Sequence, residues 1–102
     1  MSQRFFLTPS AARDLDDVLT YVLEQSGVER ARRLYDHLHK AFVAISTQPG
    51  IGHGREDLVD ESLRVWPVFA HLIIYRPDTK PVQIIRVIHG ARDVGTMFEH
   101  HV

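Results

Sequence analysis

The segment Val82–His89 (Val-Gln-Ile-Ile-Arg-Val-Ile-His) constrains the fold of this chain more than any other. It is too short for a buried helix, and its β-branched residues favour a strand. Gly90 and a short charged segment containing Arg92 and Asp93 follow it. A strand with so few polar positions belongs inside a sheet, where both of its faces are covered. We therefore predict a central or near-central strand with polar chemistry gathered at its end.

Three shorter segments also have the composition of strands. They are Gln3–Leu7, Leu63–Trp66 and His71–Arg76. A turn centred on Pro67 and a second turn over Pro77–Pro81 separate the last three strands of the chain. Because consecutive strands joined by short turns run in opposite directions, we expect these three to form an antiparallel meander.

Two amphipathic helices are predicted between the first strand and the meander. Thr8 is placed to cap the first helix, with Pro9 at its first position. Gly27 is the expected end of this helix, and a second helix begins near Val28 with an apolar face from Ala31 to Ile45. So short a connection requires an antiparallel helical hairpin. The arginines of the second helix are interpreted as its solvated face, and docking of a partner protein on that face is the alternative.

Together these elements predict a single α+β domain over residues 1–102, with the order β-α-α-β-β-β. The expected architecture is an antiparallel sheet with the helical hairpin packed on one face. Both faces of the last two strands are apolar, yet the hairpin can cover only one of them. Either the tail from Val94 or a partner protein should cover the second face, and the residues leave both alternatives open.

The composition excludes several classes of function. The chain has no cysteine, which excludes a disulfide scaffold and thiolate chemistry and fits a reducing cytoplasm. We expect a cytoplasmic protein, because no secretory signal or membrane-spanning apolar run is recognisable. A net charge of −1 gives no support to direct binding of nucleic acid. The histidines lack the spacing of a metal site, so we expect neither a metal nor a cofactor.

Cationic residues nevertheless concentrate toward the end of the chain. Between Ser62 and Arg92 lie Arg64, Arg76, Lys80, Arg86 and Arg92, with Asp78 as the acid among them. Strand alternation predicts that Arg86 lies on the same face as Ile84 and Ile88. Arg86 is interpreted either as a structural partner of a carboxylate or as a contact to another protein. His89 could exchange protons as a general acid or base, although a histidine at a strand end more often only forms hydrogen bonds.

Two further residues in this region have both a structural and a functional interpretation. Asp93 is placed to cap the segment that follows it, which leaves Arg92 as the more exposed candidate for function. Trp66 is interpreted as core or turn packing, with an exposed interface anchor as the alternative.

Four segments of the chain, in this order, resemble the ParE branch of the RelE/ParE toxin superfamily. They are Leu7–Ala11, Leu63–Val68, Leu72–Arg76 and Arg86–Asp93, the last reading Arg-Val-Ile-His-Gly-Ala-Arg-Asp. The resemblance covers nearly the whole chain. It implies the toxin of a type II toxin–antitoxin pair, of the kind found in plasmid stabilisation systems. It also implies an antitoxin whose C-terminal segment wraps around the toxin and covers apolar surface.

The superfamily contains two activities, and the residues help to choose between them. RelE-like members cleave mRNA on the ribosome, whereas ParE-like members inhibit DNA gyrase. RNA cleavage requires an acid, a base and cationic stabilisation in one place. The candidates for such a nuclease are Arg64, Arg86, His89 and Arg92. Phe98 stands where a catalytic tyrosine would be expected, and it has no proton to exchange.

We therefore expect an inhibitor of DNA gyrase, with a ribosome-dependent mRNA interferase as the alternative. A third possibility is a non-toxic protein that retains only antitoxin binding. The expected contacts to the target or the antitoxin are Arg64, Trp66, Arg76, Arg86, His89, Arg92, Asp93 and Phe98.

Overall fold

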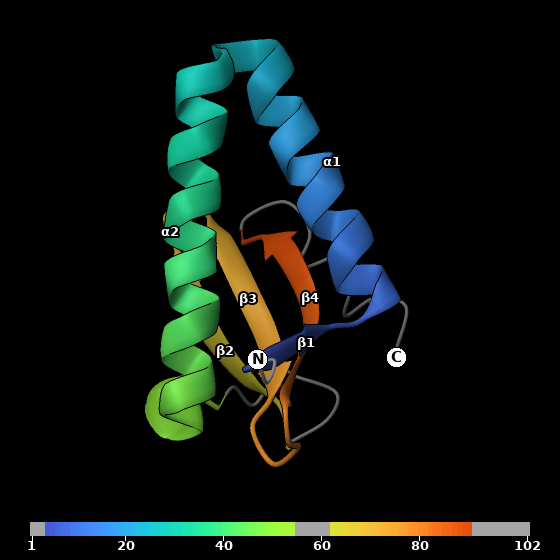
Figure 1. Cartoon of the computed structure of the whole chain (residues 1–102), viewed down its shortest axis with the longest axis vertical. Coiled ribbons are helices and arrows are strands. Elements are labelled where there is room, and N and C mark those ends of the chain that lie inside the picture. Colours follow the sequence, from blue (N-terminus) through green and yellow to red (C-terminus); the bar gives the residue numbers. More distant parts are fainter. Residues whose placement is uncertain (1–3, 55–61, 91–102) are drawn as a thin grey trace.

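A computed structural model of the chain describes residues 4–54 and 62–90. In chain order its elements are β1 (Phe5–Leu7), α1 (Pro9–Ser26), α2 (Val28–Thr47), the 3-10 helix η1 (Pro49–Ile51), β2 (Arg64–Val68), β3 (His71–Arg76) and β4 (Val82–His89). The expected α+β class is confirmed, and the order of the main elements is as predicted (Figure 1). The strand order β1-β4-β3-β2 makes β4 an internal strand, as its composition requires.

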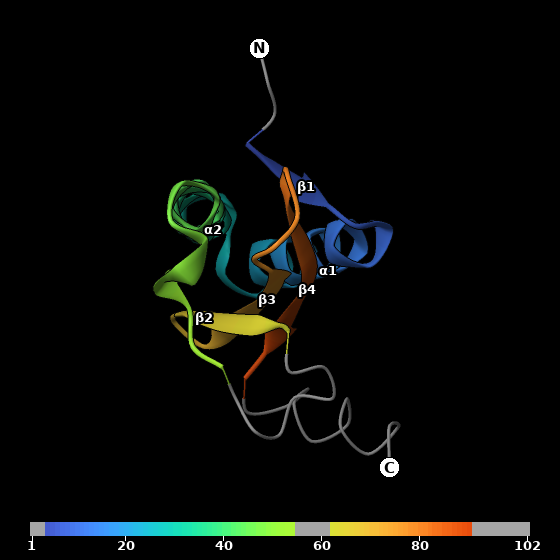
Figure 2. The ribbon, with the colours of Figure 1, turned by 90° about the horizontal axis from the view of Figure 1, so that it is seen from below.

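The two helices form the expected antiparallel hairpin. The Thr8 side chain accepts a hydrogen bond from the Ala11 backbone N–H at 3.1 Å, which caps α1. Gly27 joins the helices with a φ of 91°, a conformation that glycine adopts without steric cost. The tip of the hairpin projects beyond the strands in Figure 1, and Figure 2 shows both helices on the same side of β2 and β3. Among the described residues, no helix is long and apolar enough to cross a membrane.

Strand β1 pairs with β4 in parallel, so the sheet is mixed rather than antiparallel throughout. Phe5 lies opposite Val82 and Leu7 opposite Ile84, while the β2-β3-β4 meander is antiparallel as predicted. A short turn fixes the relative direction of the strands that it joins. Two helices separate β1 from the meander, so the sequence pattern carried no information about its direction.

A β-bulge in β4 corrects the predicted position of Arg86. Relative to β3, Ile85 is an extra residue between Ile84 and Arg86. Ile84 therefore packs beneath the helices, while Ile88 packs on the opposite face of the sheet. The expectation that Arg86 shares one face with both of them is wrong, because one inserted residue reverses the alternation of the side chains that follow.

Pro67 lies within β2, opposite Leu72, and not in a turn as predicted; the turn begins at Phe69. Proline is tolerated here because β2 is an edge strand. On the outer side of β2, Val65 and His53 exchange two backbone hydrogen bonds of 2.8 and 2.9 Å. Pro67, two residues further along, has no N–H to offer on that side. This edge is therefore a poor template for another strand.

Apolar residues pack on both faces of the sheet, as expected. The larger cluster lies between the sheet and the helices and includes Ala11, Leu38, Phe42, Ile45, Ile73, Tyr75, Ile84 and Val87. The smaller cluster, on the other face, consists of Leu63, Val65, Ile74 and Ile88, with Leu72 and Ile85 packed against it. The tail from Val94, one of the two predicted covers, is outside the described residues.

Hydrogen bonds of the Tyr75 hydroxyl connect the loop after α2 to strand β3. Its hydroxyl donates a hydrogen bond to the Pro49 carbonyl at 2.6 Å and accepts one from the Gly52 N–H at 2.9 Å. Arg64 Nη1 donates to the Gly52 carbonyl at 3.0 Å. Burial raises the pKa of the Tyr75 hydroxyl above 10.0, although the Gly52 hydrogen bond and the Arg64 charge act against this rise.

Substitution of Gly52 by alanine is expected to destabilise the fold, because the new Cβ would lie only 2.4 Å from the Tyr75 hydroxyl oxygen and 2.9 Å from the Val65 carbonyl oxygen. Such overpacking costs about 1–3 kcal/mol of unfolding free energy. Gly50→Ala is the matched control, since nothing lies within 4 Å of its Cβ. Urea denaturation of both variants measures the difference. Equal losses of stability in the two variants would contradict this account.

The raised pKa of Tyr75 predicts a loss of stability in alkali. Folding favours the neutral phenol, so the contribution is complete below the unfolded pKa of about 10 and declines as pH rises through the higher folded pKa. Tyr75→Phe removes this titration and should flatten the decline of unfolding free energy above pH 10. The measurement is the denaturant midpoint of both proteins between about pH 8 and 11, a range that spans the reference pKa of a free tyrosine, about 10.

Candidate functional site

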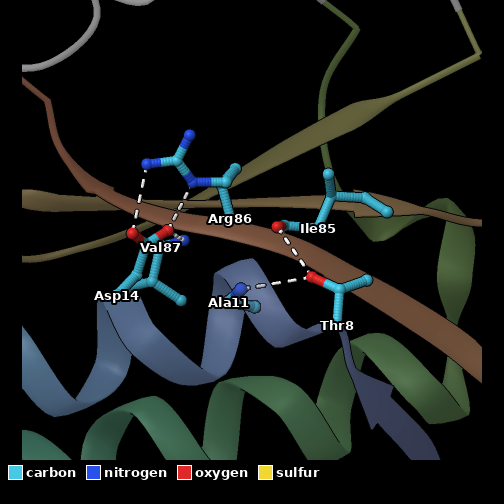
Figure 3. A network of polar contacts seen from close by, with 6 residues as sticks. All are labelled: Thr8, Ala11, Asp14, Ile85, Arg86 and Val87. Atoms are coloured by element: carbon cyan, nitrogen blue, oxygen red, sulfur yellow. Dashed lines mark hydrogen bonds and ion pairs between the residues drawn. The ribbon is translucent and has the colours of Figure 1, made fainter.

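The carboxylate of Asp14, on α1, is the centre of a polar network at the end of β4 (Figure 3). Its two oxygens accept hydrogen bonds from Arg86, one from Nε at 2.6 Å and one from Nη2 at 3.1 Å. Asp14 Oδ2 also accepts from the Val87 backbone N–H at 3.0 Å. At the N-cap of α1, the Thr8 hydroxyl donates to the Ile85 carbonyl at 3.0 Å. The start of α1 is thereby tied to successive residues of β4.

Arg86 has the structural role that was one of its two predicted interpretations. The bidentate pairing fixes the plane of the guanidinium, and charge-assisted bonds of this kind are stronger than neutral ones. The Arg86 side chain is 38% exposed, whereas that of Asp14 is 16% exposed. The ion pair is therefore only partly solvated, and its carboxylate is more buried than its guanidinium.

His89 lies in a groove of about 480 Å³ between α1 and the ends of β3 and β4. Its ring packs edge to face against His71, with 5.5 Å between the ring centroids. The remaining lining residues are Asp14, Asp17, Val18, Tyr21, Val22, Ala70 and Val87. The carboxylates of Asp14 and Asp17 make this groove better suited to a cationic or apolar group than to a phosphate.

Arg64, Arg76 and Trp66 belong to a different part of the molecule. Arg64 is held by the Gly52 carbonyl, and Arg76 Nη1 donates to the Ser62 hydroxyl at 2.8 Å. Trp66 is half-buried against the main core, and its ring stacks on His53 with 6.4 Å between centroids. This position agrees with the interpretation of Trp66 as a packing residue, one of the two given from the sequence.

The structure separates two of the described nuclease candidates, Arg64 and His89. Arg64 lies opposite Tyr75 and His89 lies opposite His71, so four residues of β3, or about 13 Å, separate them along the sheet. Arg92, Asp93 and Phe98 are outside the described residues. Within 4–54 and 62–90, no group of three or more histidines and carboxylates is placed to hold a metal ion.

Basic residues instead gather along one side of α2, the helix whose arginines were interpreted from the sequence as a solvated face or, alternatively, a docking surface. Arg30, Arg33, His37 and Lys40 follow one another at the i, i+3, i+7, i+10 spacing of a single helical stripe. We call these four residues the basic stripe. Phe69, in the β2–β3 turn, packs edge to face on His37 with 4.8 Å between ring centroids. The helical spacing alone could have indicated the stripe, but nothing in the sequence placed Phe69 beside it.

This fold, a helical hairpin on one face of a mixed sheet, defines a class of small α+β protein that occurs among solved structures. The model superposes on a chain from the "Chromosomal ParDE TA system from P. aeruginosa" with a TM-score of 0.70. The two sequences are 21% identical, and the match covers 83% of this chain and 92% of that chain. At this identity the likeness establishes the fold alone.

The sequence places the chain within a family. Residues 5–94 match the model of the ParE toxin of the type II toxin–antitoxin system parDE, so the chain belongs to the ParE toxin family. It is 35% identical over 83 residues to Toxin ParE1 of Caulobacter vibrioides, covering 81% of this chain and 84% of that protein. Toxin ParE3 of the same organism is 31% identical over 92 residues, covering 90% of this chain and 91% of that protein.

Removal of the Asp14 carboxylate should destabilise the protein more than removal of its ionic partner. Asp14→Ala loses the ion pair and leaves the Val87 N–H without its acceptor, whereas Arg86→Ala leaves that acceptor in place. We expect about 1–3 kcal/mol for the first variant and less for the second, since Arg86 is partly solvated. Asp14→Ala combined with Arg86→Ala completes a double-mutant cycle in urea. A larger loss in the Arg86 variant would contradict the proposed order.

Proposed function

We propose that this chain is a toxin that inhibits DNA gyrase and is held inactive by a cognate antitoxin. Membership of the ParE toxin family carries the proposal. Two curated toxins match over most of the chain, which makes a shared mode of action the simplest inference. The mechanism would be binding: the toxin engages the enzyme on DNA and stops replication without cleaving a bond itself.

The geometry of the described residues supports binding over RNA cleavage. A ribonuclease needs cationic stabilisation beside its acid and base. Here Arg86 is engaged by Asp14, Arg64 is engaged by the Gly52 carbonyl, and His89 faces a groove with two carboxylates. These arrangements suit structural roles for the arginines. None of these contacts would stabilise an anionic transition state at His89.

The test is a DNA supercoiling assay with purified gyrase and purified chain. The expected result is concentration-dependent loss of supercoiling with accumulation of cleaved DNA, because a poisoned gyrase holds broken strands. The same preparation is added to translating ribosomes, where mRNA should remain intact. Heat-denatured chain serves as the control in both assays. Intact supercoiling together with ribosome-dependent mRNA cleavage would reject gyrase as the target and establish the interferase.

The antitoxin is expected to be encoded beside this chain. The solved structural relative carries the name of a ParDE system, which supports a ParD-like partner. Expression of this chain alone should arrest growth, and co-expression of the neighbouring reading frame should restore it and yield a stable complex on size-exclusion chromatography. Rescue of growth without complex formation would contradict direct neutralisation.

A further inference from the structure

Phe69 combines an unfavourable backbone conformation with high exposure. Its φ is 54°, in the left-handed region, and it is the only residue other than glycine with positive φ in the part of the chain that the structure describes. Bulky residues rarely adopt this conformation, whereas glycine and asparagine do so readily. The side chain is 72% exposed, the highest value among the exposed large apolar residues.

Stability of the isolated chain does not account for phenylalanine at this position. A side chain that is mostly exposed gains little from the hydrophobic effect, because that gain scales with the apolar area removed from water. The ring contact with His37 is its one recorded aromatic packing interaction among the described residues. Strained conformations that the fold does not require are typical of functional surfaces.

The surroundings of Phe69 are basic. One groove beside it, of about 360 Å³, is lined by Arg30 and Arg33 of α2, and a second, of about 410 Å³, is lined by His37 and Lys40. Phe69 lines both grooves. The ring therefore stands as a convex apolar knob beside the middle of the basic stripe, with a hollow on either side.

We propose that the Phe69 knob and the basic stripe form the surface by which this toxin grips its target protein. The knob enters an apolar pocket on the target, and acidic residues around that pocket meet the stripe. A buried aromatic anchor surrounded by charge-complementary contacts is the composition of interaction hot spots. The proposal rests on the proposed function, since it takes the target to be the protein that the toxin inhibits.

A protein partner fits this surface better than a nucleic acid. Nucleic-acid binders carry a net positive charge on the face that meets the phosphates. This chain has a net charge of −1, and the exposed carboxylate of Asp36 lies directly before His37 on the same helix. A negative charge among the basic residues opposes a uniformly charged phosphate backbone. A protein surface with separate acidic residues can avoid the Asp36 carboxylate.

Phe69→Gly and Phe69→Asn test the knob directly, because both substitutions suit the positive φ. Thermal midpoints should stay the same or rise, while growth arrest on expression and inhibition of supercoiling should weaken at least tenfold. Tyr35→Ala is the matched control, since Tyr35 is exposed on α2 but lines a different groove. Full toxicity in stable Phe69 variants would overturn the proposal. Lower thermal midpoints in both would show that Phe69 is retained for folding, and would overturn it as well.

The basic stripe is tested by charge reversal. Arg33→Glu combined with Lys40→Glu should weaken inhibition at least tenfold, and raised salt should weaken the wild type toward the same level. Arg13→Glu combined with Arg32→Glu is the control, because it makes the same change in net charge at exposed positions away from Phe69. Equal losses in the two double variants would overturn the specific role of the stripe. Binding of labelled DNA or RNA that disappears in Phe69→Gly would overturn the assignment to a protein.

The growth assay separates this proposal from the proposed function. A wild-type chain that arrests growth without affecting gyrase rejects gyrase as the target, and the Phe69 variants still decide the role of the knob. A wild-type chain that inhibits gyrase as strongly as its Phe69 variants supports the function and rejects the knob. A chain that does neither rejects both.

Discussion

The contact between Asp14 and the end of β4 is the interaction on which the arrangement of this molecule depends. Strand β1 is three residues long and its pairing with β4 ends at Ile84. Beyond that point side chains of α1 replace a strand, since Thr8 binds the Ile85 carbonyl and Asp14 binds the Val87 N–H. A buried backbone amide without an acceptor would be costly, so these bonds fix where α1 crosses the sheet.

The fixed position of α1 and α2 over the sheet determines which surfaces are available to partners. The outer edge of β2 is bridged at Val65 by His53 and has no N–H at Pro67. The described part of the sheet therefore offers little backbone for strand addition at β2, and recognition falls to side chains. The tip of the α1–α2 hairpin projects beyond the strands (Figure 1). The middle of α2 lies beside the β2–β3 turn, because the His37 ring packs on Phe69.

The sequence predicted the elements well, because local signals define them. Thr8 and Gly27 mark helix ends through backbone geometry, and the β-branched run of β4 favours a strand. The parallel pairing of β1 and the bulge at Ile85 depend on contacts between distant segments, which no local pattern encodes. Asp14 shows the same limit. On a helical wheel it belongs to the polar side of α1, and only the position of β4 turns it into an acceptor for a strand.

The described residues of the predicted site lie in different parts of the sheet for a physical reason. Residues along a meander alternate between faces and between ends of the sheet, so Arg64 and His89 are separated although both lie near strand ends. Cations on a helix at three- and four-residue spacing stay on one side. Charge density along the sequence was therefore a poor guide to charge density on the surface. The stripe of α2 concentrates positive charge because its periodicity matches its secondary structure, and an exposed phenylalanine beside it supplies the apolar contact that charge alone lacks.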